Sequence, residues 1–151
     1  MLEPARKEDW EDIRSLSVQI HDLHAAWRPD IYYHTFDPYP LEDFLEDCIE
    51  ELVYVAREQG KIVGYVILSI IEKGGPGTVE STQLRLDSIC VDEAMRGRGI
   101  GKMIMSDVCE LAKTFNCSSL LLGVHPENTN ALAFYEKCGF SVRTINMERK
   151  I

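Results

Sequence analysis

A glycine-rich stretch holds the residues whose types and spacing are best suited to chemistry. It reads Val-Asp-Glu-Ala-Met-Arg-Gly-Arg-Gly-Ile-Gly-Lys over residues 91–102 and lies between an apolar run and an amphipathic segment. Glycines let a ligand approach the main chain closely. A helix that begins there presents free N–H groups and the positive end of its dipole. Arg96, Arg98 and Lys102 add positive charge. These features together favour a phosphate or pyrophosphate site.

Two common phosphate-binding motifs do not fit the stretch. A Walker loop is G-x-x-x-x-G-K followed by Ser or Thr, but Arg96 replaces its first glycine and Met103 its hydroxyl residue. A dinucleotide fingerprint is G-x-G-x-x-G, and its third glycine would fall on Lys102 or Ile104. The residue types alone therefore leave two alternatives, another kind of phosphate site or a tight strand-to-helix turn with solvated basic side chains.

The stretch resembles the coenzyme A loop of the GNAT superfamily of N-acetyltransferases, whose pattern is Q/R-x-x-G-x-G/A. Arg96, Gly99 and Gly101 stand at its three fixed positions. Residues 128–140 (NTNALAFYEKCGF) resemble the second signature of the family, N-x-x-A-x-x-F/L-Y-x-x-x-G-F. The preceding segment 86–92 is similar to the fourth strand of that family. Because these motifs occur in the family's order, the chain is identified as a member over nearly its whole length.

The resemblance implies an α/β fold with a central, mostly antiparallel sheet, splayed fourth and fifth strands and about four helices. It implies acetyl-CoA as co-substrate and no metal. The pyrophosphate would bind the glycine-rich turn. The pantetheine arm would pair with the fourth strand at residues 89–91, where the strand of the family bulges and splays from its neighbour. A backbone N–H of Val91 or Cys90 would stabilise the oxyanion. The implied coenzyme-binding residues are Ile89, Cys90, Val91, Arg96, Gly97, Arg98, Gly99, Ile100, Gly101, Lys102, Asn128 and Tyr135.

The resemblance also implies catalytic roles. Tyr135 matches the family's general acid, and a phenol with a reference pKa near ~10 suits a departing thiolate. Asp87 falls where many members carry an acidic residue on the fourth strand, so it is the expected general base, directly or through a water. Glu80, His125 or water alone are the alternative bases. Asn128, which matches the residue that hydrogen-bonds the coenzyme arm, also suits a helix N-cap.

The acceptor is expected to bind near the first helix and residues 28–40, which combine aromatic side chains with carboxylates. That combination suits a cationic amine or a peptide N-terminus, although it also suits ordinary loop packing. His21 and His24 are expected to line this pocket or to pack against it rather than hold a metal, because no third ligand is near. The expected function is N-acetylation of a primary amine of a small molecule or peptide. The alternative is a non-catalytic acyl-CoA-binding sensor or interaction module on the same fold. Family members are often homodimers.

Hydrophobic periodicity predicts the elements that must position these residues. Helices are predicted over 10–27, 41–49, 100–115 and 130–137, and strands over 52–58, 61–71, 84–91 and 120–124. A short strand is expected at the start of the chain, and a final strand or hairpin pair over 141–150. Residues 72–83, which include four Gly or Pro, are expected to form a mobile loop.

Composition narrows the function classes further. The 151 residues are predicted to form one domain over 1–151. Lys plus Arg number 16 against 25 Asp plus Glu, and a net charge of −9 disfavours a general nucleic-acid binder. No apolar run is long enough for a membrane span. Five cysteines without C-x-x-C spacing indicate reduced, mostly buried thiols in a cytoplasmic protein.

Overall fold

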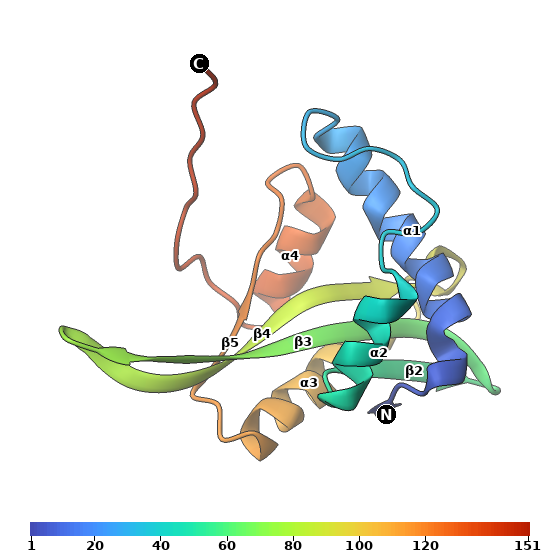
Figure 1. Ribbon diagram of the computed structural model, residues 1–151, viewed down its shortest axis with the longest axis horizontal. Helices are drawn as coiled ribbons and strands as arrows, with labels where there is room; N and C mark the ends of the chain where they lie inside the picture. The colour runs from blue at the N-terminus through green and yellow to red at the C-terminus, as the bar shows by residue number, and fades with distance from the viewer.

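The computed structural model describes all residues 1–151 and is built around one five-stranded sheet (Figure 1). Its strands are β1 (Leu2–Pro4), β2 (Val53–Glu58), β3 (Lys61–Gly75), β4 (Thr78–Val91) and β5 (Ser119–Leu122). They lie side by side in chain order. All neighbours are antiparallel except β4 and β5, which are parallel. The mixed, mostly antiparallel sheet predicted from the sequence is therefore confirmed.

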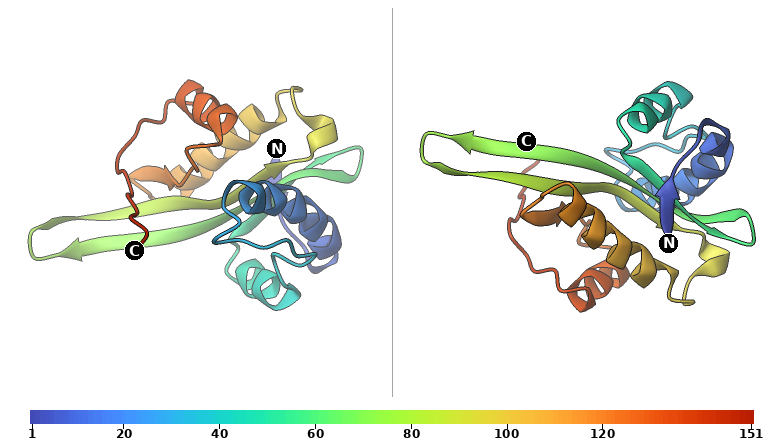
Figure 2. Two further views of the ribbon diagram at one scale, coloured as in Figure 1. Left: turned by 90° about the horizontal axis from the view of Figure 1, so that it is seen from above. Right: turned by 90° about the horizontal axis from the view of Figure 1, so that it is seen from below.

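Helices cover both faces of this sheet. Figure 2 shows α1 (Trp10–Trp27) and α2 (Leu41–Ile49) on one face, and α3 (Ile100–Thr114) and α4 (Thr129–Lys137) on the other. Two apolar clusters result, because α1, α2 and α3 bury apolar side chains against the sheet, and α4 adds partly buried ones. Ile13 and Phe44 are fully buried in the first cluster, and Ile104 and Val108 in the second. The four predicted helices and their ends agree with the structure to within a residue or so.

The start of the chain is tied to the sheet by one acidic side chain. Asp9 lies in the single-turn helix η1 (Lys7–Asp9) and is 7% exposed. Its carboxylate accepts the Arg6 N–H at 2.8 Å and a guanidinium N–H of Arg57 at 2.6 Å. Arg57 also pairs with Glu3, so β1, η1 and β2 share one ionic contact that fixes where α1 begins.

The strands β4 and β5 diverge in the middle of the sheet. Their pairing runs only from Gln83 opposite Ser119 to Leu86 opposite Leu122. Beyond Leu86, β4 continues to Val91 with no partner on that side. The splayed fourth and fifth strands expected from the family resemblance are therefore present.

The β-bulge of β4 does not lie where it was expected. Residues 89–91 pair regularly with residues 64–66 of β3. The register shifts instead between the pairs Ile67–Ser88 and Leu68–Leu86, so Asp87 is the extra residue. A bulge leaves its extra residue out of the ladder and turns the strand, which places this turn where β4 leaves β5.

Two further expectations were wrong. The predicted mobile loop over 72–83 is a hairpin, since β3 continues to Gly75 and β4 starts at Thr78. Its glycines favour a loop by composition, but glycines are also tolerated in an exposed two-stranded ribbon. The final strand over 141–150 does not form. Residues 140–151 run away from the sheet in Figure 1, so their main chain has no partner edge.

The five cysteine side chains differ in how far they are buried. All five cysteines are free, but only Cys90 is buried and Cys109 is exposed, so the expectation of mostly buried thiols was wrong. None of the helices is both long enough and apolar enough to cross a bilayer.

Candidate active site

The divergence of β4 and β5 leaves main-chain groups of β4 free. In an antiparallel ladder, successive residues turn their N–H and C=O groups to opposite edges. Asp92 donates its N–H to Val63 of β3 at 2.9 Å. Cys90 therefore also faces β3, whereas Ile89 and Val91 face the side that β5 has left. Of the two amides that the sequence left open for an oxyanion, that of Val91 is directed into the gap and that of Cys90 is not.

The glycine-rich turn after β4 leads directly into α3. A short helix, η2 (Glu93–Met95), precedes it, and Gly97 and Gly99 follow with φ angles of 77° and 84°. Gly99 is the N-cap of α3, and the first intrahelical bond there runs from Met103 N–H to the Gly99 carbonyl at 3.1 Å. The N–H groups of residues 100–102 consequently have no acceptor within the helix. An added Cβ at Gly97 or Gly99 would meet no atom within 4 Å, so the space in front of these amides is open.

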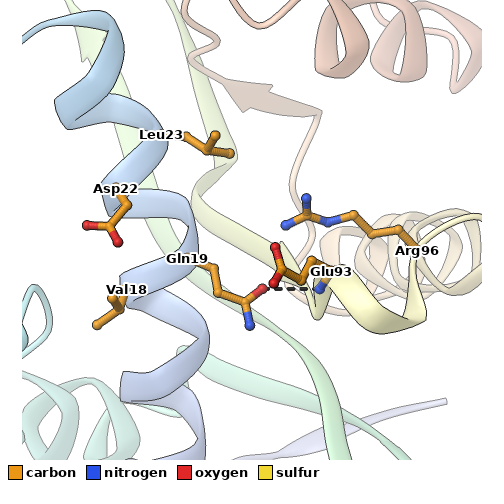
Figure 3. Close-up of a pocket in the computed structure, with 6 residues that line it drawn as sticks. All are labelled: Val18, Gln19, Asp22, Leu23, Glu93 and Arg96. Atoms are coloured by element: carbon orange, nitrogen blue, oxygen red, sulfur yellow. Dashed lines mark hydrogen bonds between the residues drawn. The ribbon is translucent and has the colours of Figure 1, made fainter.

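Helix α1 is attached to the start of this turn. The side-chain oxygen of Gln19 accepts the N–H of Glu93 at 3.1 Å (Figure 3). The same side chain donates to Asp92 at 3.5 Å. Beside this contact lies a cleft of about 340 Å³. Gln19 and Leu23 of α1 point across it toward Glu93 and Arg96 (Figure 3). Asp22 also lines the cleft, but its carboxylate is turned away from Arg96 and pairs with His34 at 2.8 Å. Arg96 donates to the carbonyl of Val91 at 3.1 Å and has no carboxylate partner, so its charge remains available.

A second cleft brings most of the expected catalytic residues together. Asp87, Ser88 and Ile89 of β4 form one wall of it. The segment after β5 and the start of α4 form the other wall, and α1 covers one end. The residues lining it are Ile20, His24, Leu86, Asp87, Ser88, Ile89, Leu122, Gly123, Val124, His125, Asn128, Ala131 and Tyr135. This cleft is the gap between the splayed strands, with Tyr135 facing Asp87 and Ile89 across it.

Tyr135 is held in this cleft by two aromatic neighbours on its own side. Its ring centroid lies 5.4 Å from that of Phe134 and 5.7 Å from that of Phe140. Burial raises the pKa of Tyr135 above its ordinary value, and the nearby Cys138 adds to the effect. The phenol is therefore protonated at neutral pH and able to donate a proton.

Asn128 begins α4 as its N-cap. Its side-chain oxygen accepts the Ala131 N–H at 3.1 Å. This bond does not use the NH₂ group of the side chain, and the residue also lines the second cleft. Both expectations for Asn128, helix capping and a position beside the coenzyme arm, are thus compatible in one side chain.

The candidate bases Asp87, Glu80 and His125 differ in where they lie relative to the second cleft. Asp87 lines the cleft and forms an ion pair with Arg85, on the same strand. Glu80 is seven residues earlier on β4, and at ~3.3 Å per residue the two lie about 23 Å apart. Glu80 therefore belongs to the exposed hairpin and not to the cleft. His125 lines the cleft, but its ring stacks on Trp27 with centroids 5.6 Å apart and planes 11° apart.

An aromatic cluster closes the end of the cleft at α1. His24 lies 5.8 Å from Trp27 and 5.6 Å from Tyr32, measured between ring centroids. Burial lowers the pKa of His24, with further lowering by His21 and His125, so its imidazole is neutral at pH 7. The expectation that His21 and His24 line or pack against this pocket fits His24, which lines the cleft; His21 contacts Tyr32 and bonds the Tyr33 carbonyl at 2.8 Å.

Sequence reasoning missed three of these contributions. Gln19 fixes the turn, Arg85 pairs with Asp87, and Trp27 supports His125. The alternation of residues 85 and 87 on a strand could have suggested the Arg85–Asp87 pair, because such residues share a face. No local signal marks the other two, since their partners are far away in sequence.

Comparison with known proteins agrees with this geometry. Residues 17–140 match the model of the acetyltransferase (GNAT) family. The chain belongs to the GNAT family. Among curated relatives, the peptidyl-lysine N-acetyltransferase YjaB of Salmonella typhimurium is 31% identical over 85% of this chain and 81% of its own. The uncharacterized N-acetyltransferase YvbK of Bacillus subtilis is 29% identical over 71% of this chain and 64% of its own.

Solved structures share this GNAT fold from end to end. A variant of the BH1408 protein from Bacillus halodurans is 25% identical and superposes with a TM-score of 0.96, covering 100% of this chain and 99% of the other. An aminoglycoside N-acetyltransferase, AAC(6′)-Iy in complex with CoA, is 21% identical with a TM-score of 0.71 and covers 100% of both chains.

The turn before α3 can be tested by replacing Gly99 with valine. The side chain would occupy the open space before the amides, so we expect acetyl-CoA to lose its protection of the protein against heat. Gly77→Val is the matched control, because Gly77 has a similar φ of 80°, equally open surroundings and a place at the distant hairpin tip. Both variants should lose ~1–2 kcal/mol from backbone strain. Retained protection of Gly99→Val, measured by thermal unfolding with and without acetyl-CoA, would show that the turn is not the site.

Proposed function

We propose that this protein is an acetyl-CoA-dependent N-acetyltransferase that acetylates a primary amine by direct attack within a ternary complex. The observation that carries the proposal is the pair of main-chain amides freed by the splayed strands, those of Ile89 and Val91, with Tyr135 lining the same cleft as Ile89. Family membership and the CoA-bound neighbour of the same fold support the choice of co-substrate. The five free cysteines support the further proposal of a cytoplasmic location.

The residues present fit the coenzyme. The N–H groups of residues 100–102 and the positive end of α3 suit a pyrophosphate, and Arg96, Arg98 and Lys102 add charge beside them. The N–H groups of Ile89 and Val91, which face the gap, suit an amide-containing arm that pairs like an added strand. When bound, acetyl-CoA supplies an activated thioester carbonyl.

Two side chains would then accept and donate the protons that the reaction moves. We assign the oxyanion contact to the Val91 N–H, which faces the gap. We assign the base to Asp87, which would take a proton from the attacking amine. We assign the acid to Tyr135, which would return a proton to the sulfur as the carbon–sulfur bond breaks. The cationic acceptor first loses one proton to water, and afterwards Asp87 gives its proton to solvent while Tyr135 is reprotonated from it. The products are an amide, a free thiol and one released proton, so atoms and charge balance.

The acceptor is proposed to be a cationic amine of a small molecule or a peptide. Asp22 and Glu93 line the neighbouring cleft beneath α1, and the aromatic cluster of His24, Trp27 and Tyr32 closes the other cleft. Carboxylates and aromatic faces both attract an ammonium group. The relative YjaB, which is named for peptidyl-lysine, supports a lysine side chain within this class.

An acceptor screen tests the proposal. Purified protein with acetyl-CoA is offered polyamines, amino acids, aminoglycosides and lysine-containing peptides, and release of free CoA thiol is followed with a disulfide reagent. We expect amine-dependent release together with an acetylated product of the matching mass. Tight binding of acetyl-CoA without release for any amine would favour the non-catalytic module instead.

Tyr135→Phe should separate catalysis from binding. Loss of the general acid is expected to lower kcat by ~10²–10⁴-fold while the Kd for acetyl-CoA changes little. Because burial raises the Tyr135 pKa, the acid is present at neutral pH, and the wild-type rate should fall only as pH rises above ~10. Tyr54→Phe, which removes the same atom from a buried tyrosine outside the clefts, is the control. A Tyr135→Phe rate equal to that of the control would remove Tyr135 from the mechanism.

Asp87→Asn tests the base against its neighbour His24. A protonated base cannot accept a proton, so kcat should fall as pH drops through the pKa of the base. We expect Asp87→Asn to lower kcat and abolish that acid limb. His24→Gln should retain the limb, since His24 is already neutral and acts as a wall of the pocket. Loss of the limb in His24→Gln, with an unchanged profile in Asp87→Asn, would reverse the assignment.

A further inference from the structure

A buried hydrogen bond joins the second cleft to the interior of the protein. The hydroxyl oxygens of Tyr65 on β3 and Ser88 on β4 lie 3.0 Å apart. Tyr65 stands opposite Cys90 in the strand pairing, and Ser88, two residues before Cys90, shares its face of the strand. The two hydroxyls therefore meet as a diagonal cross-strand pair. Tyr65 is 1% exposed, whereas Ser88 lines the second cleft.

The burial of Tyr65 decides which of the two hydroxyls donates. Its ring lies in the same apolar cluster as Ile13 and Phe44, and its hydroxyl makes one hydrogen bond, to Ser88. A buried donor that has no acceptor is costly, and burial also raises the pKa of Tyr65, so the phenol keeps its proton. Tyr65 therefore donates to Ser88. The proton of the Ser88 hydroxyl is left for a partner in the cleft.

The assigned base and the assigned oxyanion amide lie far apart on β4. Asp87 precedes Val91 by four residues, which at ~3.3 Å per residue separates them by about 13 Å. The attacking nitrogen must come within ~3–3.5 Å of the thioester carbon, whose oxygen would bond the Val91 N–H. Arg85 pairs with Asp87 and holds its carboxylate toward the hairpin end of the strand. A short aspartate side chain therefore needs a group between itself and the amine.

A water molecule bound to Ser88 would have the connections that this gap requires. Ser88 follows Asp87 directly and lines the same cleft, whose volume is about 80 Å³. A bound water needs only ~10–15 Å³ and about two to four polar partners. Ser88 would donate its O–H to one lone pair of this water, and the water would donate to the Asp87 carboxylate. The second lone pair of the water would then face the amine.

We propose that Ser88, oriented by Tyr65, is a positioning residue that holds the water through which the attacking amine passes its proton to Asp87. The inference rests on the proposed acetyltransferase function. As the carbon–nitrogen bond forms, the nitrogen gives a proton to the water, and the water gives one of its own protons to Asp87. The water is regenerated, so the step needs no further reactant. Tyr135 keeps its role as the acid toward sulfur.

The acid limb of the pH profile reports this connection. The rate depends on the ionisation of Asp87 only while the amine can pass its proton to that carboxylate. Removing the Ser88 hydroxyl should therefore have the same effect as removing the base itself. The charged and titratable groups that surround Ser88 are Arg85 and Asp87 of β4, Tyr65 of β3, His24 of α1, His125 after β5 and Tyr135 of α4.

A double-mutant cycle between Ser88→Ala and Asp87→Asn tests the proposal. The acceptor is the lysine-containing peptide of the screen or, if that peptide is not acetylated, the amine that gives the fastest release of CoA thiol. We expect Ser88→Ala to lower kcat by ~10²-fold and to abolish the acid limb, with an unchanged Kd for acetyl-CoA. The double variant should be no slower than Asp87→Asn alone, because both changes break the same connection. Ser88→Thr, which retains the hydroxyl, should restore most of the rate.

Ser69→Ala is the matched control for the serine, since it removes a buried β3 hydroxyl that has no hydrogen-bond partner and lies outside the cleft. Its rate and acid limb should equal those of the wild type. Urea unfolding checks that each variant folds cooperatively. An acid limb retained in Ser88→Ala, or losses of the two single variants that multiply in the double variant, would overturn the proposal and leave the acetyltransferase function standing. A wild type that releases no thiol with any amine would overturn both.

Tyr65→Phe tests the orientation of Ser88 separately, and it decides the matter even where Ser88→Ala does not fold. Loss of the phenol proton frees the Ser88 hydroxyl to turn, so kcat should fall, by less than in Ser88→Ala. In the Ser88→Ala background the same change should have no further effect on kcat. Tyr54→Phe is again the control, because it removes the same atom from a buried tyrosine outside the clefts. A Tyr65→Phe rate equal to that of Tyr54→Phe would overturn the proposal.

Discussion

The structure depends most on main-chain hydrogen bonding at one place. There β5 ends at Leu122 and β4 continues without a partner on that side. Backbone N–H and C=O groups must find partners, and along the rest of the sheet the neighbouring strand provides them. After Leu122 the chain passes through Gly123 to Pro126, and a proline cannot donate to a ladder. The N–H groups of Ile89 and Val91 are therefore left without a strand partner, while the Val91 carbonyl accepts from Arg96. The clefts, the aromatic walls and the glycine-rich turn are all arranged around those unpaired groups.

Three helices keep that gap open and aligned. Gln19 of α1 bonds the main chain at the start of the turn. On the other face, an added Cβ on Gly101 of α3 would lie 3.4 Å from the Phe134 ring of α4. The two helices are therefore in close contact at Gly101. Phe134 in turn contacts the ring of Tyr135. The amides of the turn and the phenol across the cleft are thus positioned by one continuous set of contacts.

Periodic patterns allowed much of the fold to be predicted. The helices and β2 have clear 3.6- and 2-residue repeats, and the two signatures located the turn and Tyr135. Register carries no such signal: the displacement of the bulge to Asp87 depends on which residue of β3 lies opposite. Glycines at 74, 75 and 77 resembled a loop because composition cannot distinguish a ribbon from a loop, and this error placed Glu80 too near the site. Residues 141–150 had the composition of a strand, but composition does not specify which sheet edge a strand pairs with, and in the structure they pair with none.

A site built from main-chain amides affects how the sequence of this protein can diverge. Amides are the same whichever amino acid carries them, so drift in the side chains of β4 costs little so long as the strand keeps its course. That is consistent with a superposition of 0.96 at only 25% identity. If the acceptor binds beside α1 as we propose, a change of acceptor amine would require substitutions in α1 and the loop after it and none in the main chain of β4.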